Sequence, residues 1–353
     1  MKRVIVVGTV GIPACYGGFE SLVENLTLNK DSGTQYIVFC SSKSYQTRMQ
    51  EYNQAQLHYL PLRANGAQSI FYDILSLIKS WNIKPDVVLI LGVSGCIFLP
   101  IFKLFSKAKI VTNIDGLEWK REKWGGLVKR FLKFSESMAV KYSDVVVTDN
   151  QAITDYVYKE YGLNSETIAY GGDHAKPETQ PQSINSQTYA LGLCRIEPEN
   201  NVEMILEAYS RTSFPIKFVG NWAASEYGRK IRVQYAKFSN IELLDPIYDI
   251  DELYKLRQGC SLYLHGHSAG GTNPSLVEMM HFGVPVFAFD CSFNRYSTED
   301  SALYFSSSDS LLNLILSTKG LCGLELNGKA MKAIALKRYT WDKVSRQYES
   351  TYI

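Results

Sequence analysis

Short apolar runs that alternate with amphipathic stretches constrain the fold of this chain more than any other feature. Residues 87–91 read Val-Val-Leu-Ile-Leu, an almost continuous apolar run typical of a parallel strand buried on both faces. Phe19, Leu22, Val23 and Leu26 recur instead at the spacing of one helix face. Because such strands and helices follow one another along the chain, the pattern predicts βαβ units and an α/β fold with doubly wound sheets.

The predicted elements form two series. The first has strands at residues 4–7, 36–40, 57–59, 87–91, 110–114 and 145–148 and helices at 19–26, 70–81, 95–105, 126–142 and 152–161. The second has strands at 189–194, 216–219, 241–244, 261–264 and 284–289 and helices at 202–211, 227–238, 251–257 and after Pro274, with last helices at 311–316, 329–338 and 341–352. Residues 174–188 between the series are polar and proline-containing, which is typical of a linker, so we expect two domains, residues 1–175 and 185–338.

Composition argues against several classes of protein. A chain of 353 residues with 46% hydrophobic residues can form two packed cores, and a net charge of +2 gives no general attraction to nucleic acid. The seven cysteines stand singly, without CxxC or zinc-site spacing, which predicts free thiols in the reducing cytoplasm. The uncharged run 87–102 contains glycine and proline and is too short to span a bilayer, so we predict no transmembrane segment.

The histidines give no metal-binding pattern. The five of them show no HExxH geometry and are accompanied by no acidic cluster. His265 and His267 are two residues apart and would share a face on an extended segment. We expect core or loop histidines and no metal site.

The stretch 265–290 predicts a strand end, a glycine-rich loop, a short helix and a second strand. Gly270 and Gly271 permit positive φ, Asn273 suits a helix N-cap, and Pro274 suits the first helical position. Free backbone N–H groups and the positive end of a helix dipole would then meet at one point, which favours a phosphate site. Glu278 would lie one turn further along and face the same pocket.

Two loops and a polar strand end are further candidates. Residues 11–20 follow the first strand with Gly17 and Gly18 but lack the GxGxxG pattern, so either a ligand loop or a structural glycine turn fits. Arg195 follows a strand of the second series and could grip a diphosphate, or it could be a surface arginine that pairs with Glu197 or Glu199. Asp115 ends the strand 110–114 and could orient or deprotonate a hydroxyl, or could simply form a turn.

Residues 103–133 form a basic segment. They contain nine lysines and arginines against three acidic residues, a net +6, and are interleaved with Trp119, Trp124, Leu127 and Phe131. Basic and aromatic side chains together suit an anionic membrane surface, and a solvated helix face is the alternative. Single-stranded nucleic acid is a weaker reading, because no RNA-binding motif accompanies the segment.

Four motifs occur in order along the chain. They are Gly-Ile-Pro-Ala-Cys-Tyr-Gly-Gly-Phe-Glu at 11–20, Asp-Gly-Leu-Glu-Trp-Lys-Arg at 115–121, Arg-Ile-Glu-Pro-Glu-Asn-Asn at 195–201 and Gly-Gly-Thr-Asn-Pro-Ser-Leu-Val-Glu at 270–278. With the two halves and the linker, they resemble the family 4 glycosyltransferases over nearly the whole chain. Within that family they are most similar to the bacterial branch that adds β-1,4-linked L-rhamnose from dTDP-L-rhamnose during capsule or exopolysaccharide synthesis.

The resemblance implies a GT-B fold, in which two Rossmann-like domains face a central cleft. It implies an N-terminal acceptor domain that includes the C-terminal helix 340–353, a C-terminal nucleotide-sugar domain, and closure of the two over the substrates. It implies transfer with retention of configuration and without a metal or cofactor, to a lipid-linked saccharide, by an enzyme bound peripherally to the cytoplasmic face of the cell membrane.

The resemblance also implies roles for individual residues. Catalytic roles fall to Arg195, Asp115 and Glu278. Donor binding falls to Gly17, Gly18, Arg195, Ile247, Tyr248, Gly270, Gly271, Thr272, Asn273, Pro274, Ser275 and Glu278. Acceptor binding falls to Tyr16, Phe19, Glu20, Asp115, Glu118 and Trp119.

Two positions depart from the family pattern. The glutamate that usually contacts donor-sugar hydroxyls is Gly270, and the lysine that usually accompanies the motif arginine is Asn200. We therefore expect backbone amides of 271–273 to hold the sugar, and Arg195 with the helix dipole to stabilise the leaving diphosphate. Glu278 would then stand alone as the carboxylate of the site. A UDP-hexose-dependent transferase, a nucleotide-sugar 2-epimerase and a non-catalytic sugar-nucleotide-binding protein are the alternatives.

Overall fold

The chain forms two compact units. The computed structural model describes residues 1–353 except 16, 121–123, 177–187 and 318–322. One unit comprises Met1–Ala169 and Trp341–Ile353, and the other comprises Tyr170–Thr340. Residues 170–175, assigned above to the first domain, group with the second, where the Gly172 N–H donates a hydrogen bond of 2.8 Å to the Tyr339 carbonyl. Most of the predicted linker lies outside the described residues.

The first unit is built on an eight-stranded sheet with the order β3-β4-β2-β1-β5-β6-β7-β8. The strands are β1 (Lys2–Val7), β2 (Thr34–Ser41), β3 (Glu51–Tyr52), β4 (Ala55–Leu60), β5 (Val87–Leu91), β6 (Lys109–Asn113), β7 (Val145–Thr148) and β8 (Glu166–Thr167). Only the β3–β4 pair is antiparallel among the pairings of this described sheet. Every residue of β5 is buried, so the apolar run predicted to be a central parallel strand is confirmed.

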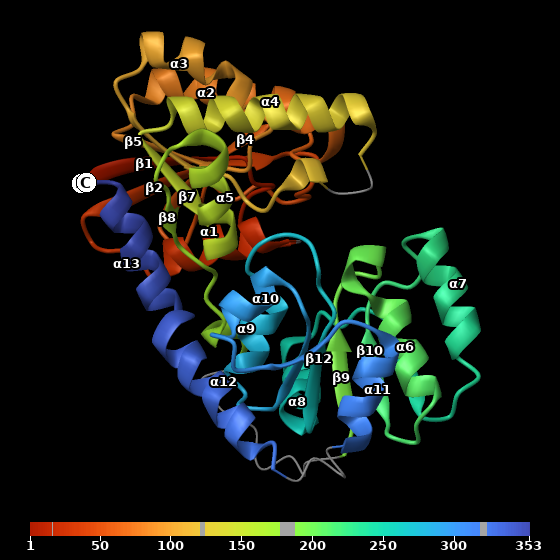
Figure 1. The fold of residues 1–353 in the computed structure, drawn as a ribbon. Helices are drawn as coiled ribbons and strands as arrows, with labels where there is room; N and C mark the ends of the chain where they lie inside the picture. The colour runs from red at the N-terminus through yellow and green to blue at the C-terminus, as the bar shows by residue number, and fades with distance from the viewer. Residues whose placement is uncertain (16, 121–123, 177–187, 318–322) are drawn as a thin grey trace. The chain divides into compact units, whose positions relative to one another are not determined.

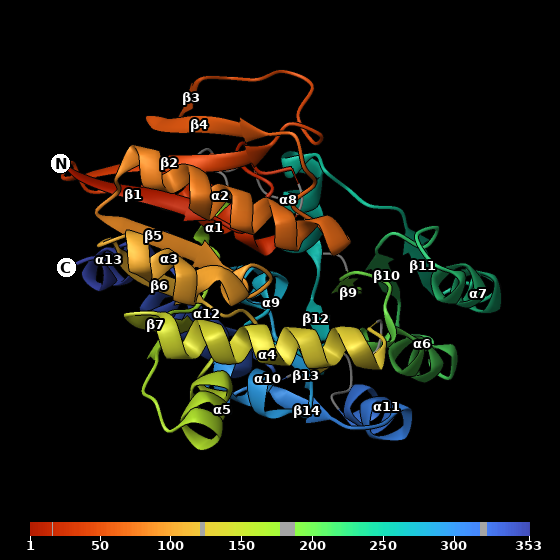
Figure 2. The ribbon, with the colours of Figure 1, turned by 90° about the horizontal axis from the view of Figure 1, so that it is seen from above.

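Helices cover this sheet on both faces. They are α1 (Gly18–Leu28), α2 (Ser69–Ile83), α3 (Leu99–Phe105), α4 (Gly126–Tyr142), α5 (Gln151–Tyr161) and α13 (Trp341–Thr351). Figures 1 and 2 show α2, α3 and α4 side by side on one face, and Figure 1 shows α1 and α13 on the other. The Asn113 side chain donates to the Tyr348 hydroxyl at 2.7 Å and Lys2 Nζ donates to the Tyr352 carbonyl at 2.8 Å, so the last helix is tied to this sheet.

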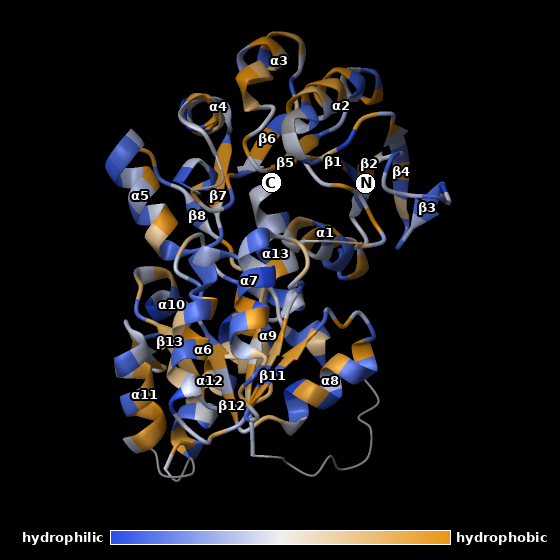
Figure 3. Cartoon of the chain, turned by 90° about the vertical axis from the view of Figure 1, so that its right-hand side faces the viewer, coloured by the Kyte–Doolittle hydropathy of each residue, from blue (hydrophilic) through white to orange (hydrophobic). Residues whose placement is uncertain are grey.

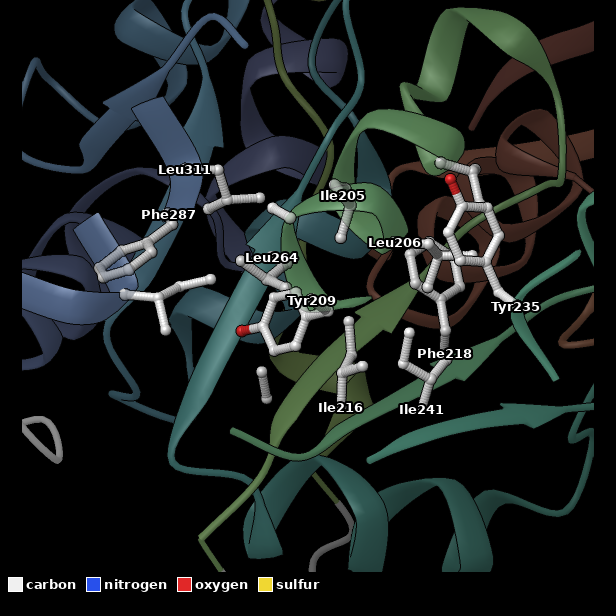
Figure 4. Close-up of a cluster of buried hydrophobic side chains, with 14 of the residues drawn as sticks. Ile205, Leu206, Tyr209, Ile216, Phe218, Tyr235, Ile241, Leu264, Phe287 and Leu311 are labelled. Carbon is white, nitrogen blue, oxygen red and sulfur yellow. The ribbon is translucent and has the colours of Figure 1, made fainter. Parts of the chain in front are cut away.

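The second unit is built on a six-stranded, fully parallel sheet with the order β11-β10-β9-β12-β13-β14. The strands are β9 (Ala190–Leu193), β10 (Ile216–Val219), β11 (Ile241–Leu244), β12 (Leu262–His265), β13 (Val286–Phe289) and β14 (Leu303–Phe305). The helices are α6 (Val202–Ser210), α7 (Glu226–Tyr235), α8 (Ile250–Gly259), α9 (Pro274–Met280), α10 (Ser292–Ser297), α11 (Ser308–Ser317) and α12 (Glu325–Arg338). Figure 4 shows part of the core, where Tyr209 on α6, Phe218 on β10 and Leu264 on β12 pack between sheet and helices.

The strand order creates one switch point in each sheet. From β9 the chain winds outward through β10 and β11, and then returns to place β12 on the other side of β9. The loops after β9 and β12 therefore diverge at the carboxyl edge of the sheet, which is where open α/β sheets bind ligands. In the first unit β1 lies between β2 and β5 in the same way, so the loop after β1 has the equivalent position.

No helix in the described part of the chain is both long and apolar enough to cross a bilayer.

Candidate functional site

The two loops at the switch point of the second unit are joined by hydrogen bonds. Asn201 Nδ2 donates to the Gly266 carbonyl at 2.8 Å, and the Ser268 N–H donates to the Glu199 carbonyl at 2.9 Å. A Cβ on Gly266 would lie 2.1 Å from the Asn200 carbonyl oxygen, so glycine is required for this close approach. The loops after β9 and β12 thus form one connected surface.

Arg195 lies at the exposed end of β9. Its side chain is 47% exposed, and Nη2 lies 3.6 Å from Glu197 Oε2. Asn200 Nδ2 donates to the Arg195 carbonyl at 2.7 Å and so holds the backbone of this residue. The pairing with Glu197 considered from the sequence is therefore present, but it leaves the guanidinium accessible to a ligand.

The glycine-rich loop after β12 has the predicted local structure. Gly270 has a φ of 118°, a conformation that side chains disfavour. The Asn273 side chain accepts a hydrogen bond of 3.0 Å from the Ser275 N–H, which confirms the N-cap, and Pro274 occupies the first turn. The helix that follows, α9, has only seven residues.

Glu278 does not stand alone, contrary to the expectation above. Its Oε2 forms an ion pair with Arg257 of α8, and its Oε1 lies 3.4 Å from His174 Nε2. Burial alone would raise the pKa of Glu278, but the charge of Arg257 and the His174 contact outweigh burial and lower the pKa below its ordinary 4.5. The carboxylate is ionised and held from two sides.

The sequence analysis missed both partners of Glu278. Arg257 ends the predicted helix 251–257 and was not singled out there, and its side chain is only 8% exposed. His174 lay in the predicted linker, although residues 170–175 pack in the second unit. Close packing brings His174 to Glu278, because a Cβ on Gly172 would lie only 2.7 Å from the Glu278 backbone nitrogen. Arg257 reaches Glu278 as a buried arginine on α8.

Ile247 and Tyr248 follow β11, at the same carboxyl edge of the sheet. Two strands, β10 and β9, separate β11 from β12. Ile247 is half-buried and Tyr248 is 80% exposed. Their assignment to the donor site stays a prediction.

The loop after β1 in the first unit is organised by Glu20. This side chain turns back to accept a hydrogen bond of 3.0 Å from the Val10 N–H, and burial, opposed by its hydrogen bonds, raises its pKa. Gly17 has a φ of 105°, and the Phe19 ring lies against Gly92 of the neighbouring loop after β5. Glu20 therefore has a structural role in the loop, and its proposed contact with an acceptor stays a prediction.

Tyr16, another predicted acceptor residue, lies outside the described residues, and Gly18 begins α1.

Asp115 follows β6 in a left-handed conformation with a φ of 62°. Its N–H donates to Asn113 Oδ1 at 2.8 Å, which gives the strand-end turn that the sequence allowed. Glu118 accepts a hydrogen bond of 2.9 Å from Trp124 Nε1. Asp115 is half-buried, and its proposed role at a ligand stays a prediction.

Trp119 belongs to an aromatic cluster around Glu136. Glu136 is 2% exposed and accepts hydrogen bonds from Trp119 Nε1 at 3.0 Å and from the Tyr156 and Tyr161 hydroxyls at 2.7 and 2.6 Å. Lys133 Nζ lies 4.7 to 5.0 Å from the centroids of the three rings. Trp119 is thus fixed by a buried carboxylate that the sequence analysis did not single out.

Comparison with solved structures shows which fold these elements form. A sucrose-phosphate synthase from Thermosynechococcus elongatus superposes with a TM-score of 0.80 at 12% identity, covering 100% of this chain and 98% of that one. HepE from Anabaena in complex with UDP gives 0.75 at 14% identity with 99% of each chain covered, and the catalytic domain of starch synthase IV from Arabidopsis thaliana gives 0.74 at 13% identity with 99% and 98% covered. The chain has the GT-B fold.

Sequence comparisons with known proteins say less about this chain than the comparison of structures does. Residues 1–173 match a family model described as a domain of unknown function, DUF1972. No significant match is found among curated protein sequences. The similarity to solved GT-B structures therefore establishes the architecture over the whole chain, and the chemistry has to be argued from the site.

His265 and His267, which are two residues apart, have different environments. His265 is buried, and burial together with the neighbouring His267 lowers its pKa well below the usual range, so it is neutral. His267 lies in the loop after β12, where Nδ1 is 2.8 Å from Asn200 Oδ1. Within the described residues no three His, Cys, Asp or Glu side chains gather in a group that could hold a metal ion.

Proposed function

We propose that this chain is a glycosyltransferase that moves a sugar from a nucleotide-sugar donor to a saccharide acceptor. The proposal is supported by the loop after β9, which contains Arg195, and the loop after β12, which contains Gly270–Ser275. The two loops are joined by hydrogen bonds at the switch point of the second sheet. Support comes from HepE, similar over 99% of both chains, which has been solved in complex with UDP-glucose. The proposed site residues need no metal or cofactor.

The chemistry follows from the charge that develops during transfer. Breaking the anomeric C–O bond leaves negative charge on the diphosphate and positive charge on the sugar ring. The Arg195 guanidinium offers a fork of donors to the diphosphate, and the N–H groups of residues 271–273 belong to the glycine-rich loop after β12. Glu278, ionised and held in place by Arg257, is assigned to the ribose hydroxyls. The transfer is proposed to retain configuration, with no protein nucleophile.

The donor is proposed to be dTDP-L-rhamnose. The four motifs that resemble the rhamnosyltransferase branch favour it, and the departure at Gly270 separates this loop from the usual family pattern. The alternative is a UDP-hexose, favoured by the structural similarity to HepE with UDP-glucose. Displacement of a bound fluorescent nucleotide tests the choice: dTDP-L-rhamnose should compete at lower concentration than UDP-glucose, and the reverse order would assign the enzyme to UDP-hexoses.

The requirement for an acceptor distinguishes a glycosyltransferase from a nucleotide-sugar 2-epimerase and from a non-catalytic binding protein. An epimerase would convert a nucleotide sugar with no acceptor present, whereas a transferase should release the nucleoside diphosphate only when an acceptor is added. A binding protein would do neither.

In the first unit, Asp115 is proposed to orient the acceptor hydroxyl, with Phe19, Glu118 and Trp119 beside the acceptor.

We further propose a lipid-linked acceptor in cell-surface polysaccharide synthesis, reached at the cytoplasmic face of the membrane. The membrane contact is assigned to an apolar and basic face on α3 and α4. Its exposed apolar residues are Ile101, Leu104, Phe105, Leu127, Val128 and Phe134. Figure 3 shows that α3 is largely apolar. Lys107, Lys129 and Arg130 supply positive charge, whereas Lys103 is paired with Asp144 at 2.8 Å.

Only part of the basic segment 103–133 is accessible for the proposed membrane contact. Lys133 forms an ion pair with Glu136, and Trp119 donates a hydrogen bond to the same carboxylate. Trp124 and Phe131 are half-buried. Leu127, by contrast, is 82% exposed. Residues 121–123 lie outside the described part of the segment.

Binding to vesicles tests this face. Vesicles rich in phosphatidylglycerol should bind the protein, binding should weaken as salt is added, and Leu104→Glu should reduce it about tenfold because a side chain that enters the lipid is lost. Leu326→Glu on α12 is the matched control, since both leucines are 77% exposed. Equal binding to phosphatidylcholine and phosphatidylglycerol vesicles, or equal loss in both variants, would contradict the assignment.

A further inference from the structure

Every buried aspartate and glutamate of the described residues lies in the first unit, at one edge of its sheet. The four are Glu20, Asp73, Glu136 and Asp149, which are between 2% and 6% exposed. The strands β1, β5, β6 and β7 are neighbours in this sheet, and the loop after each of them contains one of these carboxylates or is contacted by one. Since burying a carboxylate costs free energy, this concentration indicates that the shape of these loops is important.

Three of the four contacts are local to their loops. Glu20 accepts a hydrogen bond of 3.0 Å from the Val10 N–H after β1. Asp73 packs against Gly95 after β5, where a Cβ on the glycine would lie 2.3 Å from the Asp73 Cβ. Asp149 directly follows β7. The loops lie at the carboxyl ends of parallel strands, where open α/β sheets bind ligands, so this edge has the features of a preorganised binding surface.

The loop after β6 is held at both ends. At its start, the Asn113 side chain accepts a hydrogen bond of 2.8 Å from the Asp115 N–H and donates one of 2.7 Å to the Tyr348 hydroxyl. Asp115 has a φ of 62°, a conformation that persists only where the surroundings fix it. Further along, Trp119 Nε1 donates to Glu136 Oε2 at 3.0 Å. Glu136 on α4 is therefore the second anchor of this loop.

Glu136 is itself fixed by groups outside the loop. Its Oε1 accepts hydrogen bonds from the Tyr156 and Tyr161 hydroxyls on α5 at 2.7 and 2.6 Å, and from Lys133 Nζ on α4 at 3.2 Å. These three donors reach Oε1, whereas Trp119 reaches Oε2. Removing one of the tyrosine hydroxyls should therefore leave the contact with the loop in place.

We infer that Glu136 is a positioning residue that keeps the loop after β6 in the shape that binds the saccharide acceptor. Glu136 is 2% exposed, so it acts through Trp119 and the backbone of residues 114–120 and not by touching the ligand. The inference rests on the proposed function, which assigns the acceptor to this unit. The buried carboxylates and the strained Asp115 support a ligand site at the same edge independently of that assignment.

Hydrogen–deuterium exchange tests, without any substrate, whether Glu136 holds the loop. Glu136→Ala should speed exchange of the backbone amides of residues 114–120 by about tenfold, the effect expected for losing one hydrogen bond to a charged group. Tyr161→Phe is the matched control, because it removes a hydrogen bond of 2.6 Å to the same carboxylate from α5, and it should leave the loop unchanged.

Trp119→Phe removes the same anchor from the loop side. It should speed exchange in the same way, and it replaces Glu136→Ala if that variant does not fold. Wild-type exchange of residues 114–120 in the folded anchor variant, or equal acceleration in Tyr161→Phe, would overturn the inference.

Steady-state kinetics tests whether the shape of the loop serves the acceptor. With dTDP-L-rhamnose or UDP-glucose as donor and octyl glucoside as acceptor, Glu136→Ala should raise the acceptor KM by about tenfold and leave the donor KM unchanged. Glu136→Gln keeps an oxygen that can accept from Trp119 and should recover most of this loss, and Tyr161→Phe should leave both KM values unchanged.

The kinetic outcomes separate the inference from the proposed function. An unchanged acceptor KM in Glu136→Ala, or an equal rise in both KM values, would overturn the positioning role. If the wild-type protein transfers no sugar from either donor, the proposed function fails, whereas the exchange measurement still decides whether Glu136 holds the loop.

Discussion

Replacing Arg195 by alanine is expected to lower donor turnover by about a hundredfold or more while leaving the melting temperature unchanged. A preorganised donor aimed at charge that develops in the transition state contributes on the order of 3 kcal/mol to catalysis. The side chain is 47% exposed and its contact with Glu197 is long, so its loss should not disturb folding. Steady-state turnover and thermal unfolding of the same preparations measure the two effects separately.

Arg211→Ala is the matched control. Arg211 is 46% exposed and pairs with Asp309 at 2.6 Å, in the same unit but after α6 and away from the switch point. Its loss should leave turnover unchanged. Arg195→Lys should recover only part of the activity, because a lysine offers a point charge without the planar fork. Full activity of Arg195→Ala would remove the main catalytic assignment.

Glu278→Gln is expected to affect stability and donor binding together. The variant leaves the Arg257 guanidinium buried without its counter-ion, and breaking one side of such a pair typically costs about 3 to 5 kcal/mol of unfolding free energy. If Glu278 also binds the ribose, nucleotide affinity should fall as well. Denaturant unfolding and nucleotide titration measure the two quantities.

The stability effect should depend on pH with a definite sign. The pKa of Glu278 in the fold lies below its ordinary 4.5, so its contribution to stability is present above about pH 4.5 and is lost as the pH falls through the folded-state pKa. The difference in unfolding free energy between wild type and Glu278→Gln should therefore be constant near neutral pH and shrink in acid. A difference that grows in acid would contradict the assignment of an ionised carboxylate.

A double variant separates folding from ligand binding. Arg257→Leu combined with Glu278→Leu replaces the buried pair by apolar side chains of similar size, which is often neutral for stability. We expect this double variant to fold with near wild-type stability but to bind nucleotide weakly. Nucleotide binding at wild-type strength would show that Glu278 serves only the fold.

The architecture was predictable because its main elements carry local signals. The buried strands β5 and β12 are apolar runs, and α4 was predicted with its observed bounds because its apolar positions follow a helical period. The elements that were missed are short: β3 has two residues, β14 has three, and α10 has six. Segments of that length contain too few residues for a periodic pattern to emerge.

The site was predictable only where its geometry is local. Gly270 and Asn273 were identified because positive φ and an N-cap are properties of a few consecutive residues. The partners of Glu278 come from distant segments, Arg257 on α8 and His174 after the first unit, and no spacing rule links them.

Mass spectrometry of the reaction product tests the central proposal most directly. Purified protein would be incubated with dTDP-L-rhamnose or UDP-glucose and a glucosyl-lipid acceptor, with Arg195→Ala as the inactive control. The proposal predicts a product heavier than the acceptor by one transferred sugar, a deoxyhexose if the donor assignment is right, together with one released nucleoside diphosphate. An acceptor of unchanged mass with every dTDP and UDP sugar offered, from protein that is folded, would contradict the assignment of this chain as a glycosyltransferase.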